Sequence, residues 1–209
     1  MNFKAMKLLT LLILFIDTNA SIDVISEWET KRTSERVELQ YRWVIVGDTL
    51  KTRQIKSMFM VKAKPSRIVE NFRHAKFLEQ WALGAKTCTV FDRADDAWIT
   101  HTIFDIPPPF KRQDLIAEYR LERHVDRYTI CFTALPDYLP SEKGLKRMKH
   151  YTGQWEILPL GNGYTEVKYL TTAFSKHMAP RFILDPIMQR LLIESMENLI
   201  KLSEHERRL

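Results

Sequence analysis

The sequence contains few cysteines, few glycines and no internal repeat. Two cysteines and six glycines occur among 209 residues, and the composition does not fit a collagen-like, coiled-coil or disordered chain. Cys88 and Cys131 each fall within a predicted strand. Their spacing does not show whether the two Cα atoms are close enough for a disulfide. A disulfide and two buried free thiols both stay open, and we favour the free thiols.

Motifs for catalysis and metal binding are also absent. The sequence has no G-x-S-x-G, no H-E-x-x-H and no glycine-rich phosphate loop, which mark several hydrolase, metalloprotease and nucleotide-binding classes. The six histidines are scattered along the chain, and a lone histidine on a strand is more often structural than a metal ligand. We therefore predict no catalytic residue, no metal site and no cofactor.

Basic residues are frequent, but they do not form a nucleic-acid-binding pattern. The formal net charge is +6, and the lysines and arginines are spread along predicted strands and loops rather than clustered with aromatic residues on one helix. The sequence thus argues against nucleic acid as a partner. A weak and transient attraction to an anionic membrane surface remains compatible with this charge.

The longest hydrophobic run lies at the N-terminus. Lys4 and Lys7 precede Leu8–Ile16, which is apolar apart from Thr10, and small or polar residues follow up to Ala20. This order is typical of a signal peptide, and the run is too short for a membrane anchor. We expect residues 1–20 to be removed on export, leaving a domain of residues 21–209 in the periplasm or outside the cell. The alternative is a buried or amphipathic N-terminal helix.

The C-terminus carries a long amphipathic pattern. Asp185-Pro186 predicts a helix start, because a short acceptor side chain precedes a proline at the first helical position. Apolar residues then recur at steps of three and four up to about His205. One face of a helix of roughly 30 Å is therefore apolar. We expect Pro180–Leu184 to form a separate helical turn before it.

The rest of the chain predicts one α+β domain. We expect a short helix over residues 22–32 and two short helices between Pro65 and Gly84. Alternating apolar and polar residues predict eight antiparallel strands, and Gly161-Asn162-Gly163 predicts a tight hairpin turn. The expected strands cover residues 37–45, 52–61, 85–91, 98–104, 115–121, 128–134, 151–157 and 165–171. A bent sheet covered on one face by the C-terminal helix fits this order better than a sandwich or barrel.

Three local motifs give this order of elements a family resemblance. They are Pro65-Ser66-Arg67-Ile68-Val69 followed by Trp81, the proline-rich stretch Pro107–Asp114, and Lys146-Arg147-Met148 followed by Gly153-Gln154-Trp155. Together they resemble START-like domains of the SRPBCC superfamily, which includes exported bacterial START-like proteins and polyketide cyclase-like proteins. Two positions depart from the pattern. Gln113 stands where the family has an arginine before the aspartate, and Phe174–His177 replaces an Asp-Pro-Gly-Gly.

The resemblance implies a helix-grip fold, in which a curved antiparallel β-sheet wraps around the long C-terminal helix. Two short helices would lie between the second and third strands. It also implies an apolar cavity between sheet and helix. We therefore expect a non-enzymatic monomer that transports or sequesters a lipid, a sterol-like molecule or another hydrophobic small molecule. The alternatives are a polyketide cyclase- or hydrolase-like enzyme, with His101, Glu118 or His150 as acid or base, and an interaction module with a filled core.

The predicted ligand-binding residues are of two kinds. Large side chains are expected to point into the cavity, with ordinary core packing as the alternative. They are Trp81, Phe104, Tyr119, Phe132, Tyr151, Trp155, Phe182 and Met188. A polar group of Arg112, Asp114 and Arg147 is expected near the cavity mouth, where it would orient a ligand carboxylate or phosphate, with a surface ion pair as the alternative. We expect the Leu135–Met148 loop and the last helix to act as a lid.

Overall fold

The computed structural model describes residues 21–205 apart from 48, 107, 109 and 175–179. The predicted signal peptide lies outside the described residues. The strands are β1 (Ile22–Val24), β2 (Glu29–Thr33), β3 (Val37–Val46), β4 (Leu50–Val61), β5 (Ala85–Arg93), β6 (Ala97–Phe104), β7 (Gln113–Arg123), β8 (Tyr128–Ala134), β9 (Lys146–Arg147), β10 (His150–Gly161) and β11 (Tyr164–Phe174). The helices are α1 (Pro65–Arg73), α2 (Ala75–Trp81) and α3 (Arg181–Glu204).

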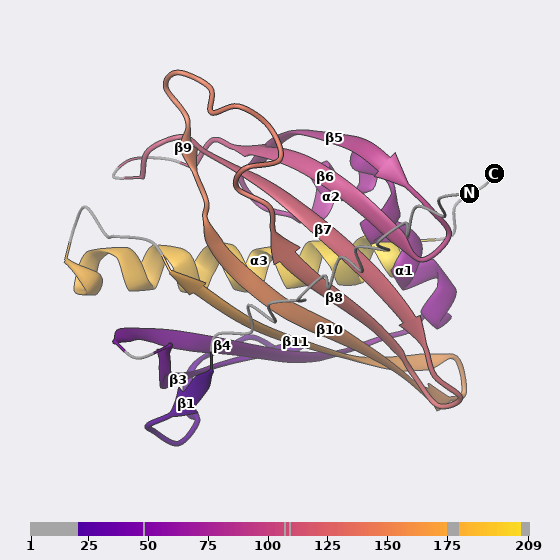
Figure 1. The fold of residues 1–209 in the computed structure, drawn as a ribbon. Coiled ribbons are helices and arrows are strands. Elements are labelled where there is room, and N and C mark those ends of the chain that lie inside the picture. The colour runs from indigo at the N-terminus through magenta and orange to yellow at the C-terminus, as the bar shows by residue number, and fades with distance from the viewer. Residues whose placement is uncertain (1–20, 48, 107, 109, 175–179, 206–209) are drawn as a thin grey trace, which may run out of the picture.

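All these strands join one sheet. Its main path runs β1-β3-β4-β11-β10-β8-β7-β6-β5, while β2 also pairs with β3 and β9 with β7. Pairing is antiparallel throughout the main path, and only the short β9 lies parallel to its neighbour. The sheet curves strongly and α3 crosses its concave side (Figure 1). The predicted α+β helix-grip architecture is therefore confirmed, with α1 and α2 between β4 and β5.

The alternation of buried and less buried side chains shows which face of a strand is turned toward α3. In β3, the buried Val37, Leu39 and Tyr41 alternate with less buried polar residues, as expected for a strand with one face on the core. The hairpin between β10 and β11 turns through Gly161, Asn162 and Gly163, all of which have positive φ. Glycine and asparagine tolerate this left-handed backbone better than other residues, and the predicted turn is confirmed.

The predicted N-terminal helix over residues 22–32 is wrong. This segment instead forms β1 and β2. Both strands pair with the same edge of β3, one after the other along its length. An edge strand offers a row of unpaired backbone N–H and C=O groups, and an incoming segment satisfies them by extending the sheet. Trp28, whose spacing suggested a helix face, lies between Arg42 and Lys56, with cation to ring-centre distances of 4.4 and 4.5 Å.

The two short helices close one end of the space beneath the sheet. Pro65 begins α1, as expected from its missing N–H. The rings of Phe72, Trp81 and Trp155 pack together, with centroid distances of 4.9–5.7 Å between the three pairs. The fully buried Asn71 donates a hydrogen bond of 2.8 Å from Nδ2 to Ser203 Oγ of α3. Aromatic packing and a buried polar link thus join α1, α2, α3 and β10.

Helix α3 begins earlier than expected. The sequence predicted a start at Asp185 after a separate turn, whereas the helix runs without a break from Arg181. The Pro180 carbonyl accepts bonds from Ile183 and Leu184, which forms the first turn upstream of the proline. Pro186 then removes only one helical hydrogen bond, near the helix start, where such a loss is tolerated. Within the described residues, no helix is both long and apolar enough to cross a membrane.

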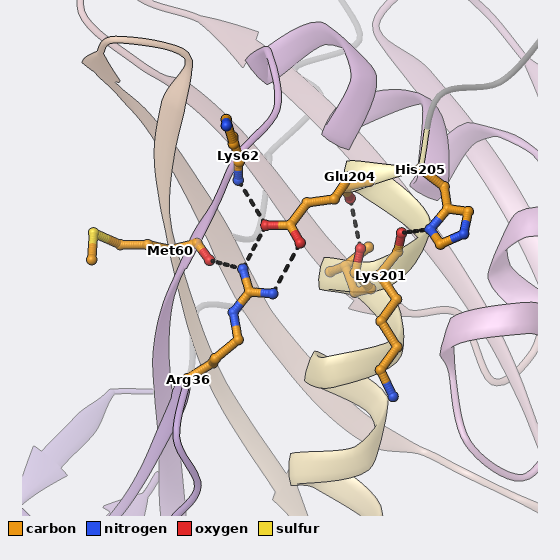
Figure 2. A network of polar contacts seen from close by, with 8 residues as sticks. Arg36, Met60, Lys62, Lys201, Glu204 and His205 are labelled. Atoms are coloured by element: carbon orange, nitrogen blue, oxygen red, sulfur yellow. Dashed lines mark hydrogen bonds and ion pairs between the residues drawn. The ribbon is translucent and has the colours of Figure 1, made fainter.

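The C-terminal end of α3 is fastened to the sheet by a charged network (Figure 2). Arg36 donates to Glu204 through both terminal nitrogens and also donates to the carbonyl of Met60. The backbone N–H of Lys62 donates to the same carboxylate at 3.0 Å. The Arg36 hydrogen bond is the main reason that the pKa of Glu204 lies below its usual value. This end of the helix is therefore held at a fixed position on β3 and β4.

Candidate functional site

A cavity of about 300 Å³ lies between the inner face of the sheet and α3. Its walls come from β3, β4, β6, β7, β9, β10, β11, α2, the connection between β6 and β7, and α3 as far as Ser195. Most of the lining is apolar. Large contributors include Leu78, Trp81, Phe104, Leu115, Met188 and Leu192. A concave, mostly apolar space with a few polar groups is the usual form of a small-molecule site.

Four tyrosines are among the polar residues that line this cavity. Tyr41, Tyr119, Tyr151 and Tyr169 all line it, and the hydroxyls of Tyr151 and Tyr169 lie 2.9 Å apart in a hydrogen bond. Burial raises the pKa of Tyr41 to about 12 and raises the pKa values of the other three as well. These phenols therefore stay protonated at neutral pH. One of Tyr151 and Tyr169 uses its proton in their mutual hydrogen bond, and the other hydroxyls can donate to an oxygen of a guest molecule.

The large side chains predicted to face the cavity fall into three groups. Five of them line it, and these are Trp81, Phe104, Tyr119, Tyr151 and Met188. Phe132 and Trp155 are buried one layer further back, stacked on Tyr151 at 4.8 Å and on Tyr169 at 4.2 Å. The inward orientation expected of Phe182 is wrong, because its side chain is 78% exposed. It is the second residue of α3 and does not line the cavity.

The polar group expected at the cavity mouth lies elsewhere. Gln113 and Leu115 line the cavity, so Asp114 between them faces the opposite, convex side of the sheet. The same alternation turns Arg147 outward, because Lys146 and Met148 line the cavity. Arg147 Nε donates to Asp114 Oδ2 at 2.8 Å. The two residues do come together as a buried ion pair, but on the wrong face to meet a guest in the cavity.

Arg147 instead holds the long loop between β8 and β9. Its terminal nitrogens donate to the carbonyls of Pro136, Leu139 and Pro140, at 2.6, 3.0 and 3.2 Å. The loop thereby covers Asp114, which is only 1% exposed. Of the loop expected to act as a lid, residues 135–148, Lys146 and Met148 line the cavity and none of the described residues 135–145 does.

Arg112 is the third member of the expected polar group. Its side chain is exposed, and its Nε is 3.9 Å from Asp105 Oδ2. Arg112 itself does not line the cavity, although its backbone carbonyl accepts a hydrogen bond of 3.0 Å from the N–H of the lining residue Lys146. Arg112 is therefore part of a surface ion pair, the alternative named in the sequence analysis.

The ion pair that does reach the cavity was missed from the sequence. Arg53 Nη1 donates to Asp185 Oδ2 at 2.9 Å, and its other terminal nitrogen donates to the second carboxylate oxygen. Both residues line the cavity. Arg53 and Ile55 are two residues apart in β4 and so share its inner face. The sequence pattern already contained this orientation of Arg53. Asp185 was interpreted as a helix cap, and its pairing with a residue 132 positions away has no local signal.

The proposed acid–base candidates do not line the cavity. Thr102, Tyr119 and Tyr151 do so, and His101, Glu118 and His150 are their immediate neighbours on the opposite face. His101 Nε2 lies 3.0 Å from Asp114 Oδ2, in the buried pair described above. Among the described residues, no three His, Cys, Asp or Glu side chains gather in a way that could hold a metal ion.

The two cysteines are free. Cys88 packs in the core beneath the sheet with Thr102, whereas Cys131 alternates with the buried Phe132 and so faces outward. Burial raises the pKa of both thiols, which lowers their reactivity.

Comparison with known proteins identifies the fold. No family model matches the chain. An uncharacterized protein of Pseudomonas aeruginosa is 37% identical over 75 residues, which is 35% of this chain and 37% of that protein. The matched region thus spans little more than a third of that relative's length.

Solved structures match over most of the chain. A STAR-related lipid transfer protein from Xanthomonas axonopodis has a TM-score of 0.73 at 21% identity, covering 83% of this chain and 97% of that one. Human StAR-related lipid transfer protein 5 has a TM-score of 0.70 at 14% identity, covering 84% and 86%. The ZhuI aromatase/cyclase from Streptomyces has a TM-score of 0.52 at 11% identity, covering 73% and 93%. These likenesses, with the sheet order and the position of α3, show that the chain has the START-like helix-grip fold.

Proposed function

We propose that the protein binds a hydrophobic small molecule in the cavity between the sheet and α3, and that it transports or sequesters this molecule without chemically changing it. The observation that carries the proposal is the cavity itself, which is largely apolar and remains open beneath a continuous sheet. The two most similar structures named above are described as lipid transfer proteins, which supports the same class of ligand.

The size of the cavity favours a slender ligand. Small-molecule pockets commonly measure about 300–1,000 Å³, so a cavity of about 300 Å³ lies at the lower end of that range. A molecule with one hydrocarbon chain fits such a volume better than a lipid with two. The tyrosine hydroxyls would then bind an oxygen of the guest, while the apolar walls remove its hydrocarbon surface from water.

The enzymatic alternative has less support. A cyclase- or hydrolase-like mechanism requires an acid or base beside the substrate, and the three candidates taken from the sequence face away from the cavity. The likeness to an aromatase/cyclase, at 11% identity, is a likeness of fold. No further observation favours catalysis over binding.

A cavity-filling substitution tests the proposal. Met188 lines the cavity from α3, and Met188→Trp would place an indole ring in the space meant for the guest. Met60 lies on the opposite face of β4 and is exposed, so Met60→Trp is a matched control with the same change in side chain. Native mass spectrometry after incubation with a total lipid extract measures the bound molecules.

The proposal predicts that wild-type protein and the Met60→Trp variant retain a hydrophobic guest. The Met188→Trp variant should remain folded, as judged by circular dichroism, and should bind little or none. Wild-type protein that takes up nothing would contradict the proposal. Equal uptake by the Met188→Trp variant would place the binding outside this cavity.

We also propose where the protein acts. Export to the periplasm or the exterior would follow from cleavage after Ala20, and N-terminal sequencing of protein recovered from cell fractions tests it.

There the protein would act as a monomer without nucleic acid, in transient contact with a membrane surface. The exposed Phe182 and Ile183 beside the cationic Arg181 support that contact. Co-sedimentation with anionic vesicles, against neutral ones, measures it.

A further inference from the structure

The charged side chains of the cavity lining gather at one end. Arg53 lies near the start of β4, Lys111 precedes β7, Lys146 belongs to β9 and Arg181 is the first residue of α3. The pairing of Gln113 with Lys146 places β9 beside the start of β7, and α3 begins at the same end of the sheet (Figure 1). The opposite end of the cavity, under α2, is apolar. The lining is thus amphipathic along its length.

Two of these cations share one aromatic ring. Trp43 is the cross-strand partner of Arg53, and the guanidinium carbons of Arg53 and Arg181 lie 5.7 and 4.7 Å from the centre of its ring. Such cation–π contacts hold the flat guanidinium groups in place. The two cations are therefore positioned before any guest arrives, which lowers the entropy lost when a guest binds.

Arg181 is under-satisfied where it stands. Asp185 is the only acidic residue among the described residues of the lining, and it pairs with Arg53. Arg181 Nη1 is buried and has no hydrogen-bond partner among the described residues. Burial and the charge of Arg53 lower the pKa of Arg181, and the nearby charge of Asp185 offsets only part of this effect. A buried donor without an acceptor is costly, so an oxygen anion supplied by a guest would relieve it.

We propose that the guest is an anionic amphiphile with a single hydrocarbon chain, whose carboxylate or phosphate lies between Arg181, Arg53 and the two lysines while its chain extends under α2. This inference rests on the proposed function and names the class of its ligand. The head-group site thus lies at the start of α3. It does not lie at Arg112 and Arg147, where the sequence predicted it, because neither residue lines the cavity. Planar guanidinium groups match both carboxylate and phosphate geometry. The structure therefore assigns a negative charge to the head group and accommodates either anion.

Three probes with the same chain test the assignment. Dodecanoate, dodecyl phosphate and dodecanol differ only in the head group. Calorimetric titration compares their affinities below the critical micelle concentrations of the two anions and below the aqueous solubility of dodecanol. At least one anionic probe should bind about tenfold more tightly than the alcohol, because charge-assisted hydrogen bonds are about twice as strong as neutral ones. High salt should weaken the binding of the anionic probe alone.

A substitution in α3 locates the site. Arg181→Gln should reduce the affinity for the anionic probe about tenfold and leave that for dodecanol unchanged. Arg190 is exposed on the same helix and outside the lining, so Arg190→Gln is the matched control and should change neither affinity. Circular dichroism confirms that both variants fold.

The outcomes separate this inference from the proposed function. Equal affinity for dodecanol and both anionic probes would overturn the inference while leaving a hydrophobic cavity site in place. An anion preference that survives Arg181→Gln would overturn the assignment to this end of the cavity. Failure of all three probes to bind would count against the proposed function itself.

Discussion

Asp185→Asn should change stability and ligand affinity in opposite directions. The wild-type carboxylate pairs with Arg53 through two hydrogen bonds. The Arg53 side chain is 17% exposed and the Asp185 side chain 25%. Exposed pairs contribute up to about 1 kcal/mol, and breaking a fully buried pair costs about 3–5 kcal/mol. This partly buried pair lies between those limits. We expect a loss of about 2 kcal/mol in the free energy of unfolding, or about 4–8 °C in Tm.

The same substitution should strengthen the binding of an anionic guest. It removes a carboxylate that repels the head group and competes for Arg53. At an effective dielectric constant of about 20, two unit charges about 7 Å apart interact by about 2 kcal/mol. Screening over a Debye length of about 8 Å reduces this to about 1 kcal/mol, which corresponds to an affinity gain of about fivefold.

Calorimetric titration with dodecanoate and with dodecanol, beside thermal unfolding of the unliganded variant, provides the assay. We expect tighter binding of dodecanoate, unchanged binding of dodecanol and a lower Tm. Dodecanoate binding that weakens or stays the same would refute the reasoning, because it would place the head group away from Asp185. An unchanged Tm would show that the ion pair contributes nothing to the fold.

Three further predictions concern the framework around the cavity. Gly153→Ala should destabilise the protein by about 3 kcal/mol or more in chemical denaturation, since the added Cβ would lie 2.1 Å from the carbonyl oxygen of Leu170; a loss below about 1 kcal/mol would contradict this packing. Arg147→Gln should cost about 3–5 kcal/mol, because it leaves the buried Asp114 with only His101 as a partner and removes the bonds to the loop carbonyls. Dodecanol affinity at low temperature should nevertheless be unchanged, and a loss of affinity would return Arg147 to the ligand site. Glu204→Gln should lower Tm at pH 7, because the folded-state pKa of Glu204 is depressed. The difference from wild type should shrink as pH falls below the ordinary glutamate pKa of about 4.3 and vanish only below the lower folded-state pKa, and a difference that persists there would exclude this ion pair as its source.

The fold was readable from the sequence where the pattern is local. The alternation of Leu39 and Tyr41 with polar residues in β3, and the three- and four-residue steps of α3, each depend on neighbours within a few positions. The missing pieces depend on distant partners. β1 and β2 form strands only because β3 leaves an edge to pair with, and the two-residue β9 exists only beside the start of β7.

The candidate site was predicted less completely, for a physical reason. A large side chain needs only the correct face of its strand or helix, and Tyr119 and Met188 do line the cavity. Charged side chains are positioned by partners that the sequence does not reveal. Asp114 lies next to Leu115 in a regular strand, and this alternation already implied the opposite face. The pairing of Arg53 with Asp185 required the three-dimensional approach of β4 to α3.

The central claim is that a hydrophobic guest lies between the sheet and α3, and isotope-filtered NMR of the labelled protein with unlabelled dodecanol tests it most directly. We predict nuclear Overhauser effects between the dodecanol chain and cavity side chains such as Trp81, Leu192 and Tyr169. Effects confined to exposed residues of the outer surface, such as Met60 and Val125, or no effects at all, would contradict the claim.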